Sequence, residues 1–170
     1  MTLKLIGALL IFAGCGGIGF SMAHQSKKEE LLLRQTVLVL EYMSCELQYH
    51  LTALPELFRG AAQSVSGEMQ DVLISIAREL ETQLYTDAAI CMRQILHQNS
   101  QLPERVTKVL EQMASSVGVF DLPGQIAGLE STQKVCEKEL NYLERNREER
   151  MRSYRTLGFC AGAALAILLF

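Results

Sequence analysis

The sequence has 170 residues, of which 49% are hydrophobic and 21% are charged, and its formal net charge is −3. This length is enough for one domain of ordinary size. The acidic balance gives no basic face that could neutralise phosphates, so a nucleic-acid partner is not expected.

The first segment, residues 5–23 (LIGALLIFAGCGGIGFSMA), contains no charged side chain. About 20 apolar residues in a helix cross a bilayer core, so residues 1–23 are predicted to form an N-terminal transmembrane helix. An alternative interpretation starts from Phe12-Ala13-Gly14-Cys15, which resembles the box before a lipidated cysteine and would make the chain a lipid-anchored exported protein modified at Cys15. The apolar run continues past Cys15 to Ala23, and this favours the uncleaved helix because a signal peptide ends near its cleavage site.

Residues 27–52 have the spacing of a helix, with apolar side chains at Leu31, Leu38, Tyr42, Cys45 and Tyr49. Five further apolar residues extend this stripe almost around the helix: Leu32, Leu33, Val37, Val39 and Leu40. A helix that is apolar on most sides is buried on several of them. We therefore expect this helix at the centre of a bundle.

Four short helices are predicted next, over residues 54–63, 68–83, 87–97 and 103–118. Pro55 and Pro103 suit a first helical turn, and Thr86 or Asp87 can cap the third of these helices. A long last helix begins near residues 122–125. Its predicted apolar side consists of Ile126, Leu129, Cys136, Leu140 and Leu143.

The chain ends in a second uncharged segment, residues 156–170, which is predicted to be a C-terminal transmembrane helix. Five arginines precede it: Arg145, Arg147, Arg150, Arg152 and Arg155. Basic residues also follow the first apolar segment, and Lys and Arg next to spans stay on the cytoplasmic side. The middle of the chain is therefore predicted to be cytoplasmic, with both termini on the opposite side. The five arginines are also predicted to contact anionic lipid headgroups; the alternative is an exposed, charged helix end.

Together these segments predict an all-α protein. Residues 24–155 form a cytoplasmic bundle of six helices, and its long first and last helices are extended by the transmembrane helices 1–23 and 156–170. Because both ends of the bundle enter the same bilayer, we expect the first and last helices to pack antiparallel.

The sequence carries no phosphate-binding glycine motif and no zinc-protease motif. Its three histidines lie on different predicted elements, and its five cysteines are scattered without metal-binding spacing. We therefore predict a protein that is not an enzyme, with no catalytic residue, metal or cofactor. The predicted spans contain glycines that let helices approach closely within a membrane: Gly14, Gly16, Gly17, Gly158 and Gly162. The alternative for these glycines is that they only face lipid.

One further stretch is unusual, CELQYHLTALPELFRGAA at residues 45–62. Glu46 and Tyr49 lie one turn apart on a largely apolar helix, just before a helix break at Leu54-Pro55-Glu56. A buried carboxylate needs a partner, which the Tyr49 hydroxyl can supply. One interpretation is a structural contact that fixes the turn. The other is that Glu46, Tyr49, Pro55 and Glu56 dock a partner protein at the end of the bundle remote from the membrane.

Three segments in order, LKLIGALLIFAGCGGIGF, LEYMSCELQYHLTALPELF and SYRTLGFCAGAALAILLF, resemble the stage III sporulation protein AB family of spore-forming bacteria. The resemblance covers essentially the whole chain. It implies a place in the mother-cell membrane around the forespore, in the channel complex that joins the two cells. The implied partners are other stage III sporulation channel proteins, including a cytoplasmic secretion-type ATPase.

The helical domain of this family is similar to the inner-membrane platform protein F of type II secretion and type IV pilus systems. The resemblance therefore implies a platform or adaptor subunit without enzymatic activity, which docks the ATPase and whose spans contact other channel proteins. Its oligomeric state stays open, with a homo-oligomer as one arrangement.

Overall fold

The computed structural model describes residues 2–82, 87–98, 101–118 and 121–169, with side chains described in residues 25–82, 87–98, 101–118 and 121–146. The regular structure in these residues is helical throughout. In chain order the helices are α1 (Thr2–Tyr49), α2 (Leu54–Gln63), α3 (Glu68–Thr82), α4 (Ala88–Gln98), α5 (Glu104–Ser116) and α6 (Leu122–Leu169). For the described residues, the predicted all-α fold with a long first and a long last helix is confirmed.

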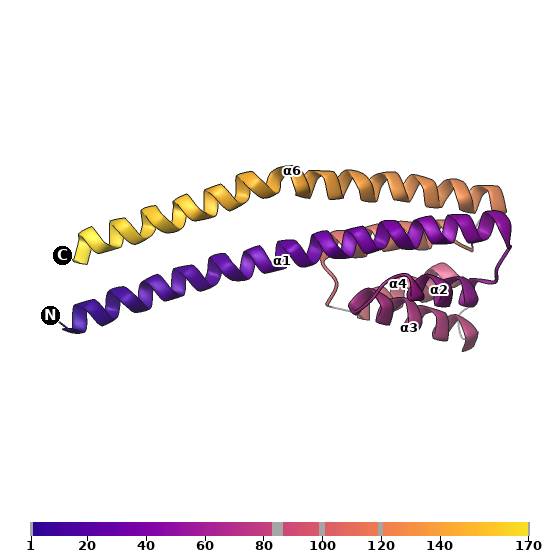
Figure 1. Ribbon diagram of the computed structural model, residues 1–170. Helices are drawn as coiled ribbons and strands as arrows, with labels where there is room; N and C mark the ends of the chain where they lie inside the picture. Colours follow the sequence, from indigo (N-terminus) through magenta and orange to yellow (C-terminus); the bar gives the residue numbers. More distant parts are fainter. Residues whose placement is uncertain (1, 83–86, 99–100, 119–120, 170) are drawn as a thin grey trace. The chain divides into compact units, whose positions relative to one another are not determined.

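The chain divides into two compact units, each described separately below. The first unit, the bundle, is Leu31–Leu140 and contains α2 to α5 with the adjoining parts of α1 and α6. The second unit combines Met1–Glu30 with Asn141–Phe170. In that unit the outer parts of α1 and α6 run in opposite directions (Figure 1).

Several sequence predictions concern residues in the outer parts of α1 and α6 whose side chains the structure does not describe. These are the two predicted spans, residues 1–23 and 156–170, and the residues Gly14, Cys15, Gly16, Gly17, Arg147, Arg150, Arg152, Arg155, Gly158 and Gly162. Over the part of the chain that could be searched, no helix has an apolar stretch long enough to cross a membrane. The spans and the contacts expected of these residues therefore stay predictions.

Local signals in the sequence account for the starts of three helices in the bundle. Pro55 stands in the first turn of α2, where its missing N–H costs no hydrogen bond. The Asp87 carboxylate caps α4 by accepting the backbone N–H of Ala89 at 2.8 Å, and Asp87 is one of the two caps that the sequence offered. Pro103, with extended backbone, precedes the first residue of α5. These ends depend on neighbouring residues alone, and so they could be located without knowledge of the tertiary packing.

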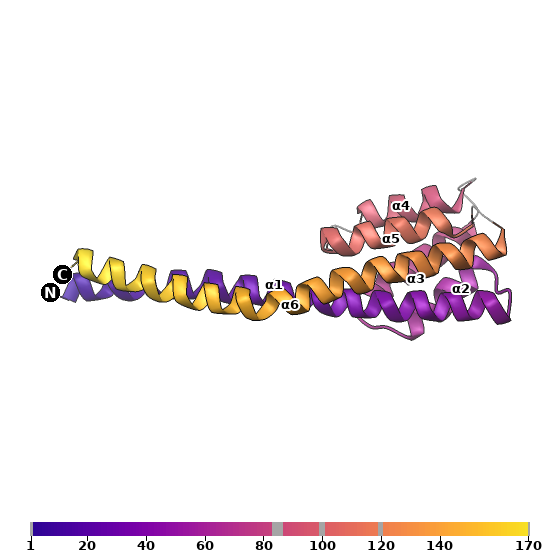
Figure 2. The ribbon, with the colours of Figure 1, turned by 90° about the horizontal axis from the view of Figure 1, so that it is seen from above.

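The two long helices lie side by side and antiparallel in the bundle, as Figures 1 and 2 both show. The contact is direct, because the Cys136 thiol on α6 donates to the backbone carbonyl of Leu33 on α1, with the sulfur 3.4 Å from the oxygen. Gln133 on α6 also donates to the Glu41 carboxylate on α1, at 3.3 Å. The predicted antiparallel packing of the first and last helices is thus confirmed within this unit.

The core of the bundle draws on all six helices. The buried positions of α2 and α3 follow a helical period, and α6 buries Leu129 and Cys136 as expected. The large side chains that are almost fully buried are Leu33, Leu40, Met43, Leu57, Phe58, Met69, Leu73, Ile76, Met92, Leu96, Leu110 and Met113. Burying a side chain of this size contributes roughly 1.5–3 kcal/mol, so this set supplies most of the free energy that holds the short helices together.

The predicted apolar stripe of α1 is not the side that faces the core. Leu31, Leu38, Cys45 and Tyr49 are exposed. The buried residues of the helix are instead Leu32, Leu33, Thr36, Val39, Leu40, Met43 and Leu47. Because apolar residues occur almost all around this helix, the side that is buried depends on where α2 and α6 pack and not on the helix itself.

Two glycines allow neighbouring helices to approach closely. A Cβ at Gly128 of α6 would lie 2.5 Å from the Cβ of Ser116 on α5. A Cβ at Gly60 of α2 would lie 2.9 Å from the ring carbon Cζ of Tyr42 on α1. Both distances are shorter than an ordinary carbon contact of about 3.5–4.0 Å, so any larger residue must displace its neighbour.

Candidate docking site

The turn between α1 and α2 is held by the Glu46 carboxylate. One oxygen of this carboxylate, Oε1, accepts a hydrogen bond from the Thr52 hydroxyl at 2.7 Å. The other, Oε2, lies 3.3 Å from Nδ1 of His50. The Glu46 side chain is 24% exposed, so both contacts are partly shielded from water. Glu46 thus ties the last turn of α1 to the residues that lead into α2.

The partner expected for Glu46 was the Tyr49 hydroxyl, and this expectation is wrong. Tyr49 is 70% exposed, and the contacts come from Thr52 and His50. The physical reason is that α1 ends at Tyr49, so the chain turns back and brings Thr52 beside the carboxylate. Of the two interpretations of this stretch, the structural one therefore applies to Glu46, while Tyr49 is left on the surface.

Leu51 is the residue of this turn that the sequence analysis missed. Its side chain is 69% exposed and its backbone has a φ of +52°. Among the described residues other than glycine, no further one has a positive φ. A helix often ends in a residue with this left-handed conformation, but that residue is usually Gly or Asn, because Cβ makes the conformation cost roughly 1–2 kcal/mol. The signal in the sequence was a large apolar residue between His50 and Thr52, just before a proline that opens a helix.

Pro55 and Glu56 lie in the first turn of α2, where Pro55 is half-buried and Glu56 is exposed. The opposite side of α2 is anchored in the core by Leu57 and Phe58, both fully buried. Glu56 therefore projects from a firmly held helix. Glu46, Tyr49, Pro55 and Glu56, the four residues predicted to dock a partner, lie within a single turn and its flanking helix ends.

Two other interhelical connections meet this turn. A Cβ at Gly118, which follows α5, would lie 3.1 Å from a methyl carbon of Leu54 and 3.3 Å from the Cβ of Ala88. Leu54 begins α2 and Ala88 begins α4, so the start of each helix lies against the segment that leads to α6. We call this group of residues, 49–56 with 87–88, 118 and 121–122, the junction end of the bundle.

The junction end carries carboxylates and lacks strongly basic side chains. Asp121 accepts the backbone N–H of Gly124 at 3.3 Å, as Asp87 does for Ala89 at α4, so both carboxylates stand at helix starts. Glu46 and Glu56 add two further negative charges. The sequence has no Lys or Arg in residues 46–58, 79–92 or 109–133. The junction end is therefore mainly acidic, and Arg59, which follows Glu56 by one turn, is paired with Glu81.

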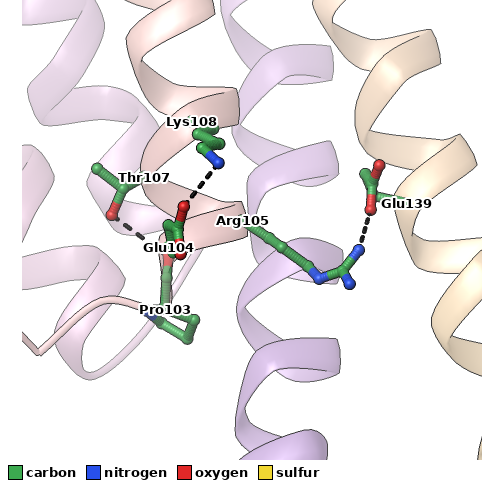
Figure 3. A network of polar contacts seen from close by, with 6 residues as sticks. All are labelled: Pro103, Glu104, Arg105, Thr107, Lys108 and Glu139. Carbon is green, nitrogen blue, oxygen red and sulfur yellow. Dashed lines mark hydrogen bonds and ion pairs between the residues drawn. The ribbon is translucent and has the colours of Figure 1, made fainter.

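Another polar group joins α5 to α6 away from these connections (Figure 3). Arg105 on α5 donates to the Glu139 carboxylate on α6 at 2.5 Å, with each side chain more than one third exposed. One turn along α5, Lys108 and Glu104 form an ion pair on the surface at 2.6 Å. The hydrogen bond from Lys108 lowers the pKa of Glu104 from its usual value. Both pairs are exposed enough that they add little to stability, and of the two only Arg105–Glu139 connects α5 with α6.

The cysteines with described side chains differ in their surroundings. Cys91 and Cys136 are buried, whereas Cys45 is exposed. Burial raises the pKa of the Cys136 thiol to about 12, helped by the nearby carboxylates of Glu137 and Glu139. A thiol in this state is a poor nucleophile. No group of three or more His, Cys, Asp or Glu side chains suited to a metal ion occurs in the residues that could be examined.

Of the arginines predicted to lie at the membrane surface, Arg145 has a described side chain, and it is exposed. Exposure leaves it available to a headgroup, and the contact itself stays a prediction.

Comparison with known proteins places the chain within a family. The sequence profile of a family described as stage III sporulation protein AB matches residues 4–170. A solved structure of a stage III sporulation protein AB has a similar fold, with a TM-score of 0.65 and 17% sequence identity. The match covers 72% of this chain and 98% of that one. At this identity the structural likeness shows the fold alone. A comparison with curated proteins gave no match.

Proposed function

Because the chain belongs to the stage III sporulation protein AB family, we propose that it is a platform subunit, without enzymatic activity, of the channel complex between mother cell and forespore. In this proposal residues 1–23 and 156–170 hold the protein in the mother-cell membrane around the forespore. The bundle lies in the cytoplasm and both termini lie on the opposite side. The placement is supported by the basic residues that flank both apolar segments on their inner sides.

The bundle docks a cytoplasmic secretion-type ATPase through its junction end. The observation that carries this part of the proposal is the exposure of Tyr49, 70%, at a turn whose backbone is held in place by Glu46. An exposed aromatic side chain is typical of residues that dominate binding at protein interfaces, and a tyrosine loses little side-chain entropy when it is buried. Glu56 adds a charge beside it on an anchored helix.

The remaining contacts of the proposed platform involve its ends. Gly14, Gly16, Gly17, Gly158 and Gly162 let the spans pack closely against each other or against spans of other channel proteins. The arginine-rich segment before the second span, which begins at Arg145, contacts anionic headgroups. Neither contact requires chemistry by this chain, in keeping with a scaffolding role.

The docking proposal is tested with the full chain in lipid nanodiscs and the purified sporulation ATPase of the same organism. Tyr49→Ser and Glu56→Lys are expected to weaken ATPase binding at least tenfold and to lower the yield of spores, since each removes an exposed contact without touching the core. Glu130→Lys, which reverses the charge of an exposed carboxylate on α6 outside the junction end, is the matched control and should leave binding unchanged. Normal ATPase binding and normal spore yield in both junction-end variants would show that this end is not the docking site.

A further inference from the structure

The exposed conformation of Leu51 is not explained by the stability of the bundle. A left-handed φ of +52° disfavours a leucine, and glycine or asparagine would fit the same turn with less strain. The side chain is 69% exposed, so it gains little from burial in return. A strained residue with no compensating contact inside the molecule is a sign of a functional position.

Leu51 and Tyr49 together form an exposed apolar pair on one turn. The backbone between and around them is held at three points. The backbone N–H of His50 donates to the carbonyl of Glu46 at 2.9 Å, and that of Leu57 donates to the carbonyl of Ala53 at 2.9 Å. The Thr52 hydroxyl is bound by Glu46. The pair is therefore presented in a preorganised form, which lowers the entropy lost on binding.

The charged side chains near this apolar pair are mainly acidic. Glu56, Asp87 and Asp121 belong to the junction end, and Glu46 lies just before it. Arg59, one turn after Glu56 on α2, is paired with Glu81, and His50 lies beside Glu46. A partner with an acidic surface would be repelled by these carboxylates, whereas a partner with a basic surface would be attracted to them. Exposed apolar side chains together with charged residues are typical of protein interfaces.

We infer that Leu51 is the central anchor of the junction end, and that the partner bound there presents an apolar pocket bordered by Lys and Arg side chains. This inference rests on the proposed function, because it takes the docked ATPase as the partner. Beyond that function, it names Leu51 as the residue that inserts into the partner's pocket, and it gives the sign of the charge on the partner's surface. The strain at Leu51 is then the cost of holding an apolar side chain out toward the pocket.

The test uses the full chain in nanodiscs, with the purified ATPase as the probe and binding measured by surface plasmon resonance. Leu51→Asn keeps a residue that accepts the left-handed turn and removes the apolar side chain. We expect this variant to bind at least tenfold more weakly while its thermal unfolding temperature is equal to or above that of the wild type. Leu38→Asn makes the same change at an exposed leucine of α1 and should bind within twofold of the wild type.

The sign of the partner's charge is tested by ionic strength. Raising the salt from about 0.1 M to about 1 M shortens the screening length from roughly 10 Å to 3 Å, so the wild-type affinity should fall. Glu56→Lys should bind more weakly and respond less steeply to salt than the wild type.

The outcomes separate this inference from the function on which it rests. If the wild-type chain does not bind the ATPase, both fall. Suppose that the wild type binds, that Tyr49→Ser weakens binding, and that Leu51→Asn binds as tightly as the wild type. The role of Leu51 as anchor is then refuted, whereas docking of the ATPase at the junction end is supported. An affinity that is unchanged or increased at high salt refutes the basic partner surface.

Discussion

Replacing Gly128 by Ala tests the closest approach of α5 and α6. The new Cβ would lie 2.5 Å from the Cβ of Ser116 and 2.6 Å from its Oγ. The oxygen can rotate away, but the Cβ of Ser116 is attached to the backbone of α5, so the helices must separate by about 1 Å to reach an ordinary contact. Overpacking of this kind costs about 1–3 kcal/mol, against a gain of about 1 kcal/mol in helix propensity from Gly to Ala. The expected net effect is a loss of about 1 kcal/mol in the free energy of unfolding.

The assay is thermal unfolding of the detergent-purified chain, followed by circular dichroism, in a double-mutant cycle with Ser116→Gly. A loss of 1 kcal/mol lowers the midpoint by about 2–4 °C for a chain of this size. In the Ser116→Gly background the obstacle is gone, so Gly128→Ala should stabilise by up to about 1 kcal/mol. Gly67→Ala is the control: it has a φ of +67° and no atom within 4 Å of the added Cβ, so it should destabilise equally in both backgrounds. If Gly128→Ala stabilises the chain equally in both backgrounds, the described approach of the two helices is refuted.

Four further predictions concern other parts of the bundle. Gly60→Ala should destabilise by about 1 kcal/mol in the same thermal assay, because its Cβ meets the Tyr42 ring, and Tyr42→Leu should reverse the effect. Asp87→Ala removes the cap of α4 and should cost about 1 kcal/mol, whereas Asp87→Asn should retain most of the stability; equal melting of both variants would count against the cap. At about pH 8 a maleimide should modify Cys45 and leave Cys136 unmodified, as mass spectrometry would reveal. Because burial raises the pKa of Cys136 from 9.0 to about 12, its contribution to the free energy of unfolding is complete below pH 9 and is lost as the pH rises toward 12. The free energy of unfolding measured with urea should therefore fall more steeply between pH 9 and pH 12 for the wild type than for Cys136→Ala.

The helix ends could be predicted where the sequence carries a local signal. The predicted bounds of α2 agree with the structure because a proline in its first turn sets its start, and α4 begins after the capping aspartate that was proposed. The core side of α1 could not be predicted in the same way. Leu38 and Val39 are adjacent and both apolar, yet Leu38 is 49% exposed and Val39 is fully buried. Their difference arises from the helices packed beside them, which the local sequence does not encode.

The turn after Tyr49 could be located from the sequence, because a carboxylate and an aromatic residue precede a helix break, and its role in docking stays a prediction. The partner of Glu46 was missed, since it depends on the chain turning back at Thr52. Leu51 was missed for a different reason: no local rule assigns a left-handed conformation to leucine, and only the structure reveals it.

The proposal that the bundle is cytoplasmic while both termini lie on the opposite side of the membrane is tested most directly by labelling of cysteines in protoplasts. The chain is expressed in the plasma membrane with Cys15 and Cys160 replaced by Ser, so that the exposed Cys45 reports on the bundle. A second version also carries Cys45→Ser and Thr2→Cys. A membrane-impermeant maleimide should label the Thr2→Cys chain in intact protoplasts, and should label Cys45 only after the membrane is disrupted. Labelling of Cys45 in intact protoplasts would contradict the account.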